Sequence, residues 1–242
     1  MVKSDSMRII INEKQEKNII KYLTKEFLIN EAALDSFSLD ELKSKRYFKD
    51  RLNYCRAHLG FPIGNGSSRV VFQIDDDKVL KLAKNAKGIA QNQEEENRYH
   101  NMFDYVLPRV YEASDDFSFI IAEYVLPSKE KDFKHITNLS FDEFRDFLCA
   151  VYNNYAYRDK RINWTYSDLR TNSDEFWDMV LENECLDAIN DYLGNTNYDD
   201  IGDLLNLGNW GLANRDGHAT LVILDNGLSA EIFNKFYNKT NR

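Results

Sequence analysis

The chain has 242 residues, which is enough for a two-lobed domain, or for a domain with a helical extension, and enough to bury a core. Hydrophobic residues make up 43% of it and aromatic residues 13%, a composition that excludes a disordered protein. The net charge of −9 argues against a nucleic-acid-binding protein and against an anionic-membrane-binding protein, because both need clustered lysine and arginine.

The cysteine pattern and the hydropathy predict a compartment. Cys55, Cys149 and Cys185 are odd in number, widely separated and free of any C-x-x-C pair, which is typical of a reducing compartment. The sequence shows no secretory signal pattern at its start and no apolar run of roughly 18 residues. We therefore expect a cytoplasmic protein without a membrane partner.

Residues 1–60 are predicted to form a helical extension that packs on the rest of the chain. An apolar strand candidate over residues 7–11 is followed by a capping asparagine, Asn12, and by helical spacing over residues 13–28. This opening is similar to the starts of phage proteins, which would place the chain in a host cytoplasm or in a virion.

A second helix of the extension is expected over residues 39–58. Ser38 and Glu41 have the spacing of a capping box at its start, and Gly60 is expected to end it.

Residues 61–83 form the stretch around which the other motifs are arranged. They predict a Gly-x-Gly turn at Gly64 and Gly66, a β-rich run, an acidic turn and a second strand that carries Lys81. Glycines let a backbone approach phosphate groups and present N–H groups to them. A lysine on the neighbouring strand supplies a positive charge to the same phosphates. The alternative is an ordinary hairpin with an Asn-Gly turn at Asn65.

A polar helix is expected after Lys81, over residues 87–103, and it carries three consecutive glutamates. Glu95 is the candidate partner of Lys81, because a strand and a helix that share a face bring such side chains together. Glu94 and Glu96 remain competitors, since the helical phase is uncertain by a few residues. The alternative is that all three lie on a solvated face.

Two further strands are predicted over residues 107–111 and 117–125, joined by a turn at Asp115 and Asp116. Counting a first short strand from Pro62, five strands then lie between residues 61 and 127, and we expect them to form a small antiparallel sheet.

From Ser140 onward the pattern becomes helical. Ser140 and Glu143 form another capping box, and an apolar stripe follows it; a further helix is expected over residues 173–193, ending at Gly194. Both stripes are rich in aromatic residues, which are core residues far more often than ligand contacts. We expect these helices to form a second, helical lobe.

A hairpin near residue 217 is predicted to bring two oxygen ligands together. Its strands cover residues 210–213 and 220–224 around an Asp-Gly turn, with Asn209 immediately before the first strand and Asp225 immediately after the second. Because Mg²⁺ prefers oxygen donors, this arrangement suits a metal–phosphate site.

In this order the motifs resemble those of the protein-kinase-like superfamily. GNGSSRVVF stands where that family has its G-x-G-x-x-G-x-V loop, and VLKL, with Lys81, stands where it has V-A-I-K. Asp203 stands at the aspartate of H-R-D-L, and Asp225 stands at the aspartate of D-F-G.

The departures from the family pattern are also specific. Arg69 replaces the third glycine of the loop, and Ile201 and Gly202 replace the histidine and arginine before Asp203. Asp203 lies one position further from Asn209 than in the family, so Asp199 and Asp200 remain possible substitutes. Few residues follow Asp225, so the peptide-docking platform is expected to be missing or replaced by the amino-terminal helices.

The resemblance implies an α+β, two-lobed kinase-like fold, with a helical extension over residues 1–60, a nucleotide-binding lobe over 61–127 and a reduced helical lobe over 128–242. ATP and Mg²⁺ would be the cofactors. It also implies that Gly64, Gly66 and Lys81, with Glu95, bind phosphate, and that backbone atoms of Glu123 and Val125 bind adenine. Asn209 and Asp225 would bind the metal ion. Asp203 and Asn209 would be the catalytic residues.

Two functions follow from the resemblance. The first is an ATP-dependent phosphotransferase that acts on a protein hydroxyl group or on a small molecule. The alternative is a pseudokinase-type binding or scaffold protein with little or no turnover, such as a phage structural or host-interaction component. A nucleic-acid-binding module built on residues 1–60 is disfavoured by the acidic balance.

Overall fold

The structure is a computed structural model that describes residues 37–100, 105–155, 174–195, 201–224, 227 and 229–236. The chain divides into two compact units, residues 1–62 and residues 63–242. The strand expected over residues 7–11 and the helix expected over 13–28 lie outside the described residues.

In the first unit, two helices occupy the range for which one was predicted. They are α2 (Leu39–Ser44) and α3 (Phe48–Leu59). The prediction of a single helix over 39–58 was wrong. The backbone is extended at Lys45 and Tyr47, and the turn there lets Tyr54 reach back to Ser38. The Tyr54 hydroxyl accepts from the Ser38 N–H at 2.8 Å, so only the Ser38 Oγ half of the predicted capping box forms. Gly60 ends α3, as predicted, with φ 77°.

The second unit contains a five-stranded antiparallel sheet, and these are the five strands expected between residues 61 and 127. The strands run in the order β1-β2-β3-β5-β4, so that β3 is central. Side chains alternate between half-buried and buried along β2, whereas five of the six residues of β3 are buried. The bounds are β1 (Gly64–Asn65), β2 (Arg69–Gln73), β3 (Lys78–Ala83), β4 (Val110–Ala113) and β5 (Phe119–Glu123).

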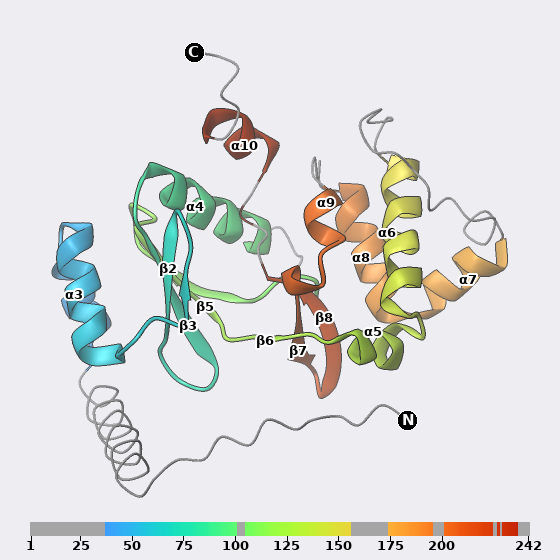
Figure 1. The fold of residues 1–242 in the computed structure, drawn as a ribbon, viewed down its shortest axis with the longest axis horizontal. Coiled ribbons are helices and arrows are strands. Elements are labelled where there is room, and N and C mark those ends of the chain that lie inside the picture. Colours follow the sequence, from blue (N-terminus) through green and yellow to red (C-terminus); the bar gives the residue numbers. More distant parts are fainter. Residues whose placement is uncertain are drawn as a thin grey trace, which may run out of the picture. The chain divides into compact units, whose positions relative to one another are not determined.

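Helix α4 (Ala86–His100) packs on strands β3, β4 and β5 (Figure 1). Its start is capped by Asn85, whose Oδ1 atom accepts from the backbone N–H groups of Lys87 and Gly88. A Cβ atom at Gly88 would overlap the carbonyl oxygen of Ser68, so only glycine permits this close approach between the helix and the sheet.

A second, three-stranded antiparallel sheet consists of β6 (Leu126–Pro127), β7 (Trp210–Arg215) and β8 (His218–Ile223). The predicted hairpin is β7–β8, and its turn residues Asp216 and Gly217 have φ 54° and 90°. Two positive φ values are the requirement of a type I′ turn, which is why an Asp-Gly pair predicted this turn correctly.

Among the described helices after β6, the predicted start of α6 is confirmed, because the helix begins behind a complete Ser140–Glu143 capping box. The prediction of a single helix over 173–193 was wrong. Two helices, α7 and α8, occupy that range, because Asn183 caps the second helix through the N–H of Leu186 and donates to the carbonyl of Ile136. Helices α5, α9 and η2 were not predicted. The bounds are α5 (Glu130–Thr137), α6 (Phe141–Tyr155), α7 (Asp174–Glu182), α8 (Glu184–Asn195), α9 (Ile201–Leu204), the 3₁₀ helix η2 (Leu207–Asn209) and α10 (Ala230–Phe236).

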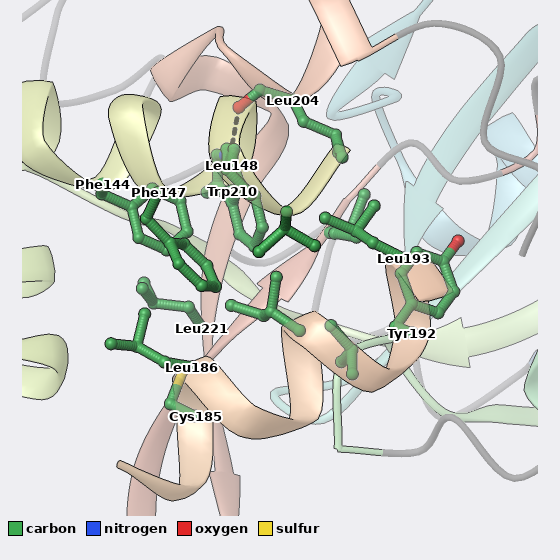
Figure 2. Packing of buried hydrophobic residues seen from close by; sticks show 14 of the residues in the cluster. Phe144, Phe147, Leu148, Cys185, Leu186, Tyr192, Leu193, Leu204, Trp210 and Leu221 are labelled. Carbon is green, nitrogen blue, oxygen red and sulfur yellow. Dashed lines mark hydrogen bonds between the residues drawn. The ribbon is translucent and has the colours of Figure 1, made fainter. Parts of the chain in front are cut away.

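The aromatic stripes of α6, α7 and α8 are core, as predicted, and belong to one buried cluster with Trp210 of β7, in which Figure 2 shows Phe144, Phe147 and Leu148 of α6 beside the Trp210 ring. The Trp210 ring meets that of Phe144 edge to face at a centroid distance of 5.0 Å. Its Nε1–H donates to the carbonyl of Leu204 at 2.7 Å, so the polar atom of this buried ring is satisfied.

The described part of the chain is therefore an α+β fold with antiparallel sheets. Among the described residues, no helix is long and apolar enough to cross a membrane.

Candidate functional site

Lys81 and Glu95 form the ion pair that was predicted between β3 and α4. Lys81 lies in the middle of the central strand, opposite Val71 of β2 and Ile120 of β5. Its Nζ atom is 2.6 Å from Oε2 of Glu95. Both residues are buried, with exposed fractions of 9% for Lys81 and 2% for Glu95.

The competing glutamates pair elsewhere. Glu94 accepts from Nε of Arg98 at 2.8 Å, and Glu96 lies 3.1 Å from the imidazole of His100. Both pairs run along the surface of α4 with i,i+4 spacing, which is the ordinary role of charged residues on a helix. Glu95 is thus the glutamate that turns into the sheet.

Arg69, at the start of β2, is a second cation on the same carboxylate. Its guanidinium lies 2.6 Å from Oε1 of Glu95 and 3.4 Å from Oδ1 of Asn92. In the sequence, Arg69 is recognisable only as a replacement of a glycine in the loop pattern, and its residue type gives no indication of this partner.

The environment of Glu95 acts on its pKa in two directions. Complete burial by itself would raise the pKa of this carboxyl group, because burial penalises the charged form. The charges of Arg69 and Lys81, together with their hydrogen bonds, outweigh that effect and lower the pKa of Glu95 below its ordinary value. Glu95 is therefore an anion at neutral pH.

Two further polar residues of α4 are buried beside this pair. Asn92 donates from Nδ2 to the carbonyls of Lys81 and Phe117, at 3.3 and 2.9 Å. Gln91 accepts from the hydroxyl of Ser68. These bonds fix α4 against β3 and against the loop before β2, so the face that carries Glu95 is polar and hydrogen-bonded.

The glycine loop is closed by contacts of its own. The N–H of Gly66 donates to the carbonyl of Arg69 at 3.0 Å, and the amine of Lys84 binds both Asn65 Oδ1 and the Gly66 carbonyl. Neither Gly64 nor Gly66 has a positive φ, and a Cβ atom at either position would make only ordinary contacts. The fold therefore does not require these glycines, and their role in binding phosphate stays a prediction.

Asp203 and Asn209 lie at two ends of one short segment. Asn209 donates from Nδ2 to the backbone carbonyl of Asp203 at 2.8 Å, and Asp203 is partly exposed in α9. The Asn209 carbonyl accepts from the N–H of Leu224 at 2.9 Å, which ties this segment to the end of β8. Since Nδ2 is the donor, Oδ1 is the atom of Asn209 that could bind a metal ion.

Asp225, with Asn226, lies outside the described residues, and so do the substitutes Asp199 and Asp200. Gly227, two positions after Asp225, is described and buried against α4. A Cβ atom there would lie 2.8 Å from the Gln91 carbonyl oxygen and 3.2 Å from Cγ of Glu95. The Asp-Asn-Gly motif thus ends at Gly227, beside Glu95, the residue that binds Lys81.

Glu123 and Val125 are held by contacts that the sequence did not reveal. The Glu123 carboxylate accepts from both terminal nitrogens of Arg215, each at 2.7 Å, and the Glu123 N–H bonds to the carbonyl of Arg109. The Val125 side chain is buried against Ala213 of β7. A buried arginine at the end of a strand has no sequence signature, because most arginines at strand ends are exposed.

The donor atoms suit the two expected cofactors. The ammonium group of Lys81 can bind a phosphate, and an amide oxygen such as Asn209 Oδ1 is a ligand type that Mg²⁺ accepts. Among the described residues, no group of three or more His, Cys, Asp or Glu side chains could hold a metal ion. A magnesium site here needs Asp225 as well.

No protein-family model matches this chain, and no curated protein matches its sequence.

Proposed function

We propose that the chain has a two-lobed, protein-kinase-like fold and is an ATP- and Mg²⁺-dependent phosphotransferase that acts on a hydroxyl group of a protein or a small molecule. The observation that carries the proposal is the buried ion pair between Lys81 on the central strand and Glu95 on the following helix. Protein kinases use a strand lysine and a helix glutamate in this relation to hold the phosphates of ATP.

Stability alone does not explain why a protein would keep a buried ion pair. Removing two charges from water costs several kcal/mol per ion, and well-packed apolar residues often stabilise a protein equally well. Lys81 lies among the buried apolar side chains of β3, where an apolar residue would complete the core. A cation kept at that position is best explained by an anionic ligand.

The contacts around the Asp-Asn-Gly motif support the same function. Leu224, before the motif, is hydrogen-bonded to Asn209, and Gly227, at its end, packs against Glu95. The motif therefore starts next to the proposed metal ligand Asn209 and ends next to the proposed phosphate-binding pair. In our proposal Asp225 supplies the second metal ligand between these two anchors.

The roles of the residues follow from their chemistry. Lys81 binds phosphate oxygens of ATP and is held in place by Glu95. Asn209 and Asp225 hold Mg²⁺, which neutralises charge on the phosphates when it is bound. Asp203 orients the acceptor hydroxyl group and accepts its proton. It lies six positions before Asn209 in the sequence.

A thermal-shift titration with ATP, with and without Mg²⁺, tests the proposal. A ligand that binds the folded protein stabilises it by about 2.7 kcal/mol at a concentration of 100 Kd. We expect the melting temperature to rise with ATP and to rise further with Mg²⁺. If the melting temperature is unchanged up to millimolar ATP and Mg²⁺, the protein does not bind the nucleotide and the proposal is wrong.

Replacing Asp225→Asn tests the metal site. The amide lacks the anionic oxygen that Mg²⁺ prefers, so we expect nucleotide binding to lose its dependence on Mg²⁺ while binding of ATP alone persists. Isothermal titration at several Mg²⁺ concentrations measures this. The matched control is Asp216→Asn, because Asp216 lies in the exposed β7–β8 turn. An unaltered Mg²⁺ dependence in Asp225→Asn would place the metal elsewhere, with the turn at Asp75 as the first alternative.

The second candidate is a scaffold protein of the same fold that binds a partner without turnover. The closed glycine loop favours it, because the Gly66 N–H donates to Arg69 instead of facing outward as a phosphate donor. Incubation with labelled ATP and a panel of acceptors separates the two functions. Absence of both transfer and ATP hydrolysis would favour the scaffold.

A further inference from the structure

Both oxygen atoms of the Glu95 carboxylate are occupied, each by a cation from a different strand. Oε2 binds Lys81 of β3 and Oε1 binds Arg69 of β2, both at 2.6 Å. The lysine contact is the one on which the proposed function depends. The arginine contact comes from the position at which the kinase-like loop pattern has its third glycine, so it is specific to this chain.

Arginine suits this position physically. Its guanidinium group is charged at every accessible pH, is planar, and carries five N–H donors in a fixed arrangement. Arg69 uses one nitrogen for both Glu95 and Asn92, which lie one turn apart on the same face of α4. One side chain of β2 therefore holds two successive turns of the helix.

Other contacts hold α4 on either side of Glu95. Toward its start, Gly88 allows the helix to approach Ser68 closely. Toward its end, Arg98 donates to the hydroxyl of Tyr192 on α8 at 3.1 Å. The helix backbone is thus fixed along its length, and the remaining freedom is the rotation of the Glu95 side chain, which the Arg69 contact restricts.

We propose that Arg69 is a positioning residue, which fixes the Glu95 carboxylate so that its second oxygen faces Lys81 whether or not nucleotide is bound. The consequence for phosphate binding rests on the proposed function, in which Lys81 is the phosphate ligand. The pairing of Lys81 with Glu95 is then a permanent feature of the folded chain. In protein kinases, by contrast, the positioning of the helix that carries this glutamate is a point of control.

The test measures the reactivity of Lys81 in nucleotide-free protein, and so it does not depend on the proposed function. Acetic anhydride acylates only a neutral amine that it can reach, so pairing with a carboxylate slows the reaction, and mass spectrometry of peptides gives the rate at Lys81 alone. The variants are Arg69→Gln, which removes the charge, and Arg69→Lys, which keeps it. Lys78→Gln is the control, because it removes a cation from the far end of β3, opposite Glu123.

We expect Arg69→Gln to raise the acylation rate at Lys81 about tenfold, because one charge-assisted hydrogen bond no longer holds the carboxylate. Arg69→Lys and Lys78→Gln should stay near the wild-type rate. A purely structural role would instead increase acylation at many lysines and would not be rescued by lysine. An unchanged rate at Lys81 in Arg69→Gln overturns the proposal.

The acid stability of the same variants gives a second readout. The lowered pKa of Glu95 means that the folded state binds its proton less readily than the unfolded chain does. The stabilisation is therefore present above the unfolded-state pKa and is lost as pH falls through the folded-state pKa. Arg69→Gln removes one of the charges that lower this pKa, so we expect its acid-side loss of stability to be smaller than in wild type and to be complete at higher pH. Coincident acid limbs would contradict the inference.

Nucleotide titrations then separate the two proposals. If wild type shows no ATP-dependent melting shift, the proposed function fails while the acylation result still decides the role of Arg69. If wild type binds ATP and Arg69→Gln binds it equally well while Lys81 acylation rises, Arg69 positions Glu95 but not for phosphate binding, and the functional half of the inference falls.

Discussion

Two buried centres of the second unit differ in chemistry. Around Trp210, aromatic and aliphatic side chains of α6, α7 and α8 fill the interior, and the ring nitrogen has its own partner. Between α4 and the five-stranded sheet, the buried set is polar and charged, with Lys81, Glu95 and Asn92 among its members. Both centres are enclosed, but only the first resembles an ordinary hydrophobic core.

This difference predicts that the two centres have different roles, one in the stability of the fold and the other in ligand binding. Burial of apolar surface stabilises a protein by about 25 cal/mol per Å². A buried ion pair contributes little net stability, because desolvation offsets its attraction. The aromatic centre is therefore expected to dominate the free energy of unfolding, and the polar centre to dominate ligand binding. Four substitutions test this division, in decreasing order of their effect on stability.

The largest loss is expected for Trp210→Ala. Removing a fully buried tryptophan leaves a cavity and takes away the partner of the Leu204 carbonyl, which costs about 3–5 kcal/mol. Urea unfolding followed by circular dichroism measures the change. Trp177→Ala is the matched control, since this tryptophan is only partly buried at the edge of the same cluster and should cost clearly less. Equal losses would show that the cluster is not centred on Trp210.

Gly88→Ala should have the next largest effect. The new Cβ atom would overlap the Ser68 carbonyl oxygen, which is backbone and cannot turn aside, so α4 must shift at a cost of about 1–3 kcal/mol. Gly66→Ala is the control for the loop itself, because its Cβ atom would meet only one atom, 3.9 Å away. Thermal melting of both variants distinguishes them, and an equal effect would refute the close approach.

Lys81→Met should change stability by less than about 1 kcal/mol, because Glu95 keeps its pairing with Arg69 and methionine fills a similar volume. The same variant should lose the ATP-dependent rise in melting temperature. Retention of a wild-type shift would mean that Lys81 is not the phosphate ligand. A loss of several kcal/mol would mean that the polar centre also stabilises the fold, which would contradict the different roles expected for the two centres.

Asp203→Ala should have the smallest effect on stability of the four, because Asp203 is partly exposed and the bond from Asn209 goes to its backbone carbonyl, which the substitution keeps. Removing a group that orients the acceptor commonly lowers the rate by about 10²–10⁴-fold. We therefore expect ATP binding like that of wild type and a loss of phosphoryl transfer or ATP hydrolysis. Equal turnover would transfer this role to Asp199, Asp200 or water.

The elements that the sequence predicted well are those in which local chemistry decides the structure. The Asp216–Gly217 turn follows from the need for positive φ, and the α6 start follows from a reciprocal Ser140–Glu143 cap. The Lys81–Glu95 pair was predicted from the kinase-like order of the motifs, since a strand and a helix that share a face make such a pair feasible but do not by themselves select Glu95 over Glu94 and Glu96. In each case neighbours in sequence, or one strand and the next helix, determine the outcome.

The remainder depends on contacts between distant residues. The break at Lys45 serves a bond between Ser38 and Tyr54, and the break at Asn183 serves a bond to Ile136 on another helix. Helical periodicity continues across both breaks, so the pattern alone predicted continuous helices. The contact between Arg69 and Glu95 was not predicted either, because it too joins distant residues. A charged residue at the end of a strand is expected to be solvent-exposed.

The Glu123–Arg215 pair has a consequence for biosynthesis. Its two residues are separated by 92 positions, and Arg215 also binds the carbonyl of Leu107, 108 positions away. At a translation rate of about 5–20 residues per second, Glu123 is added to the chain roughly 5–20 s before Arg215. During that interval the nascent chain already contains all five strands of the first sheet, while the carboxylate at the end of β5 lacks its guanidinium partner. Synthesis of β7 supplies that partner, so a strand of the second sheet neutralises a charge at the end of a strand of the first.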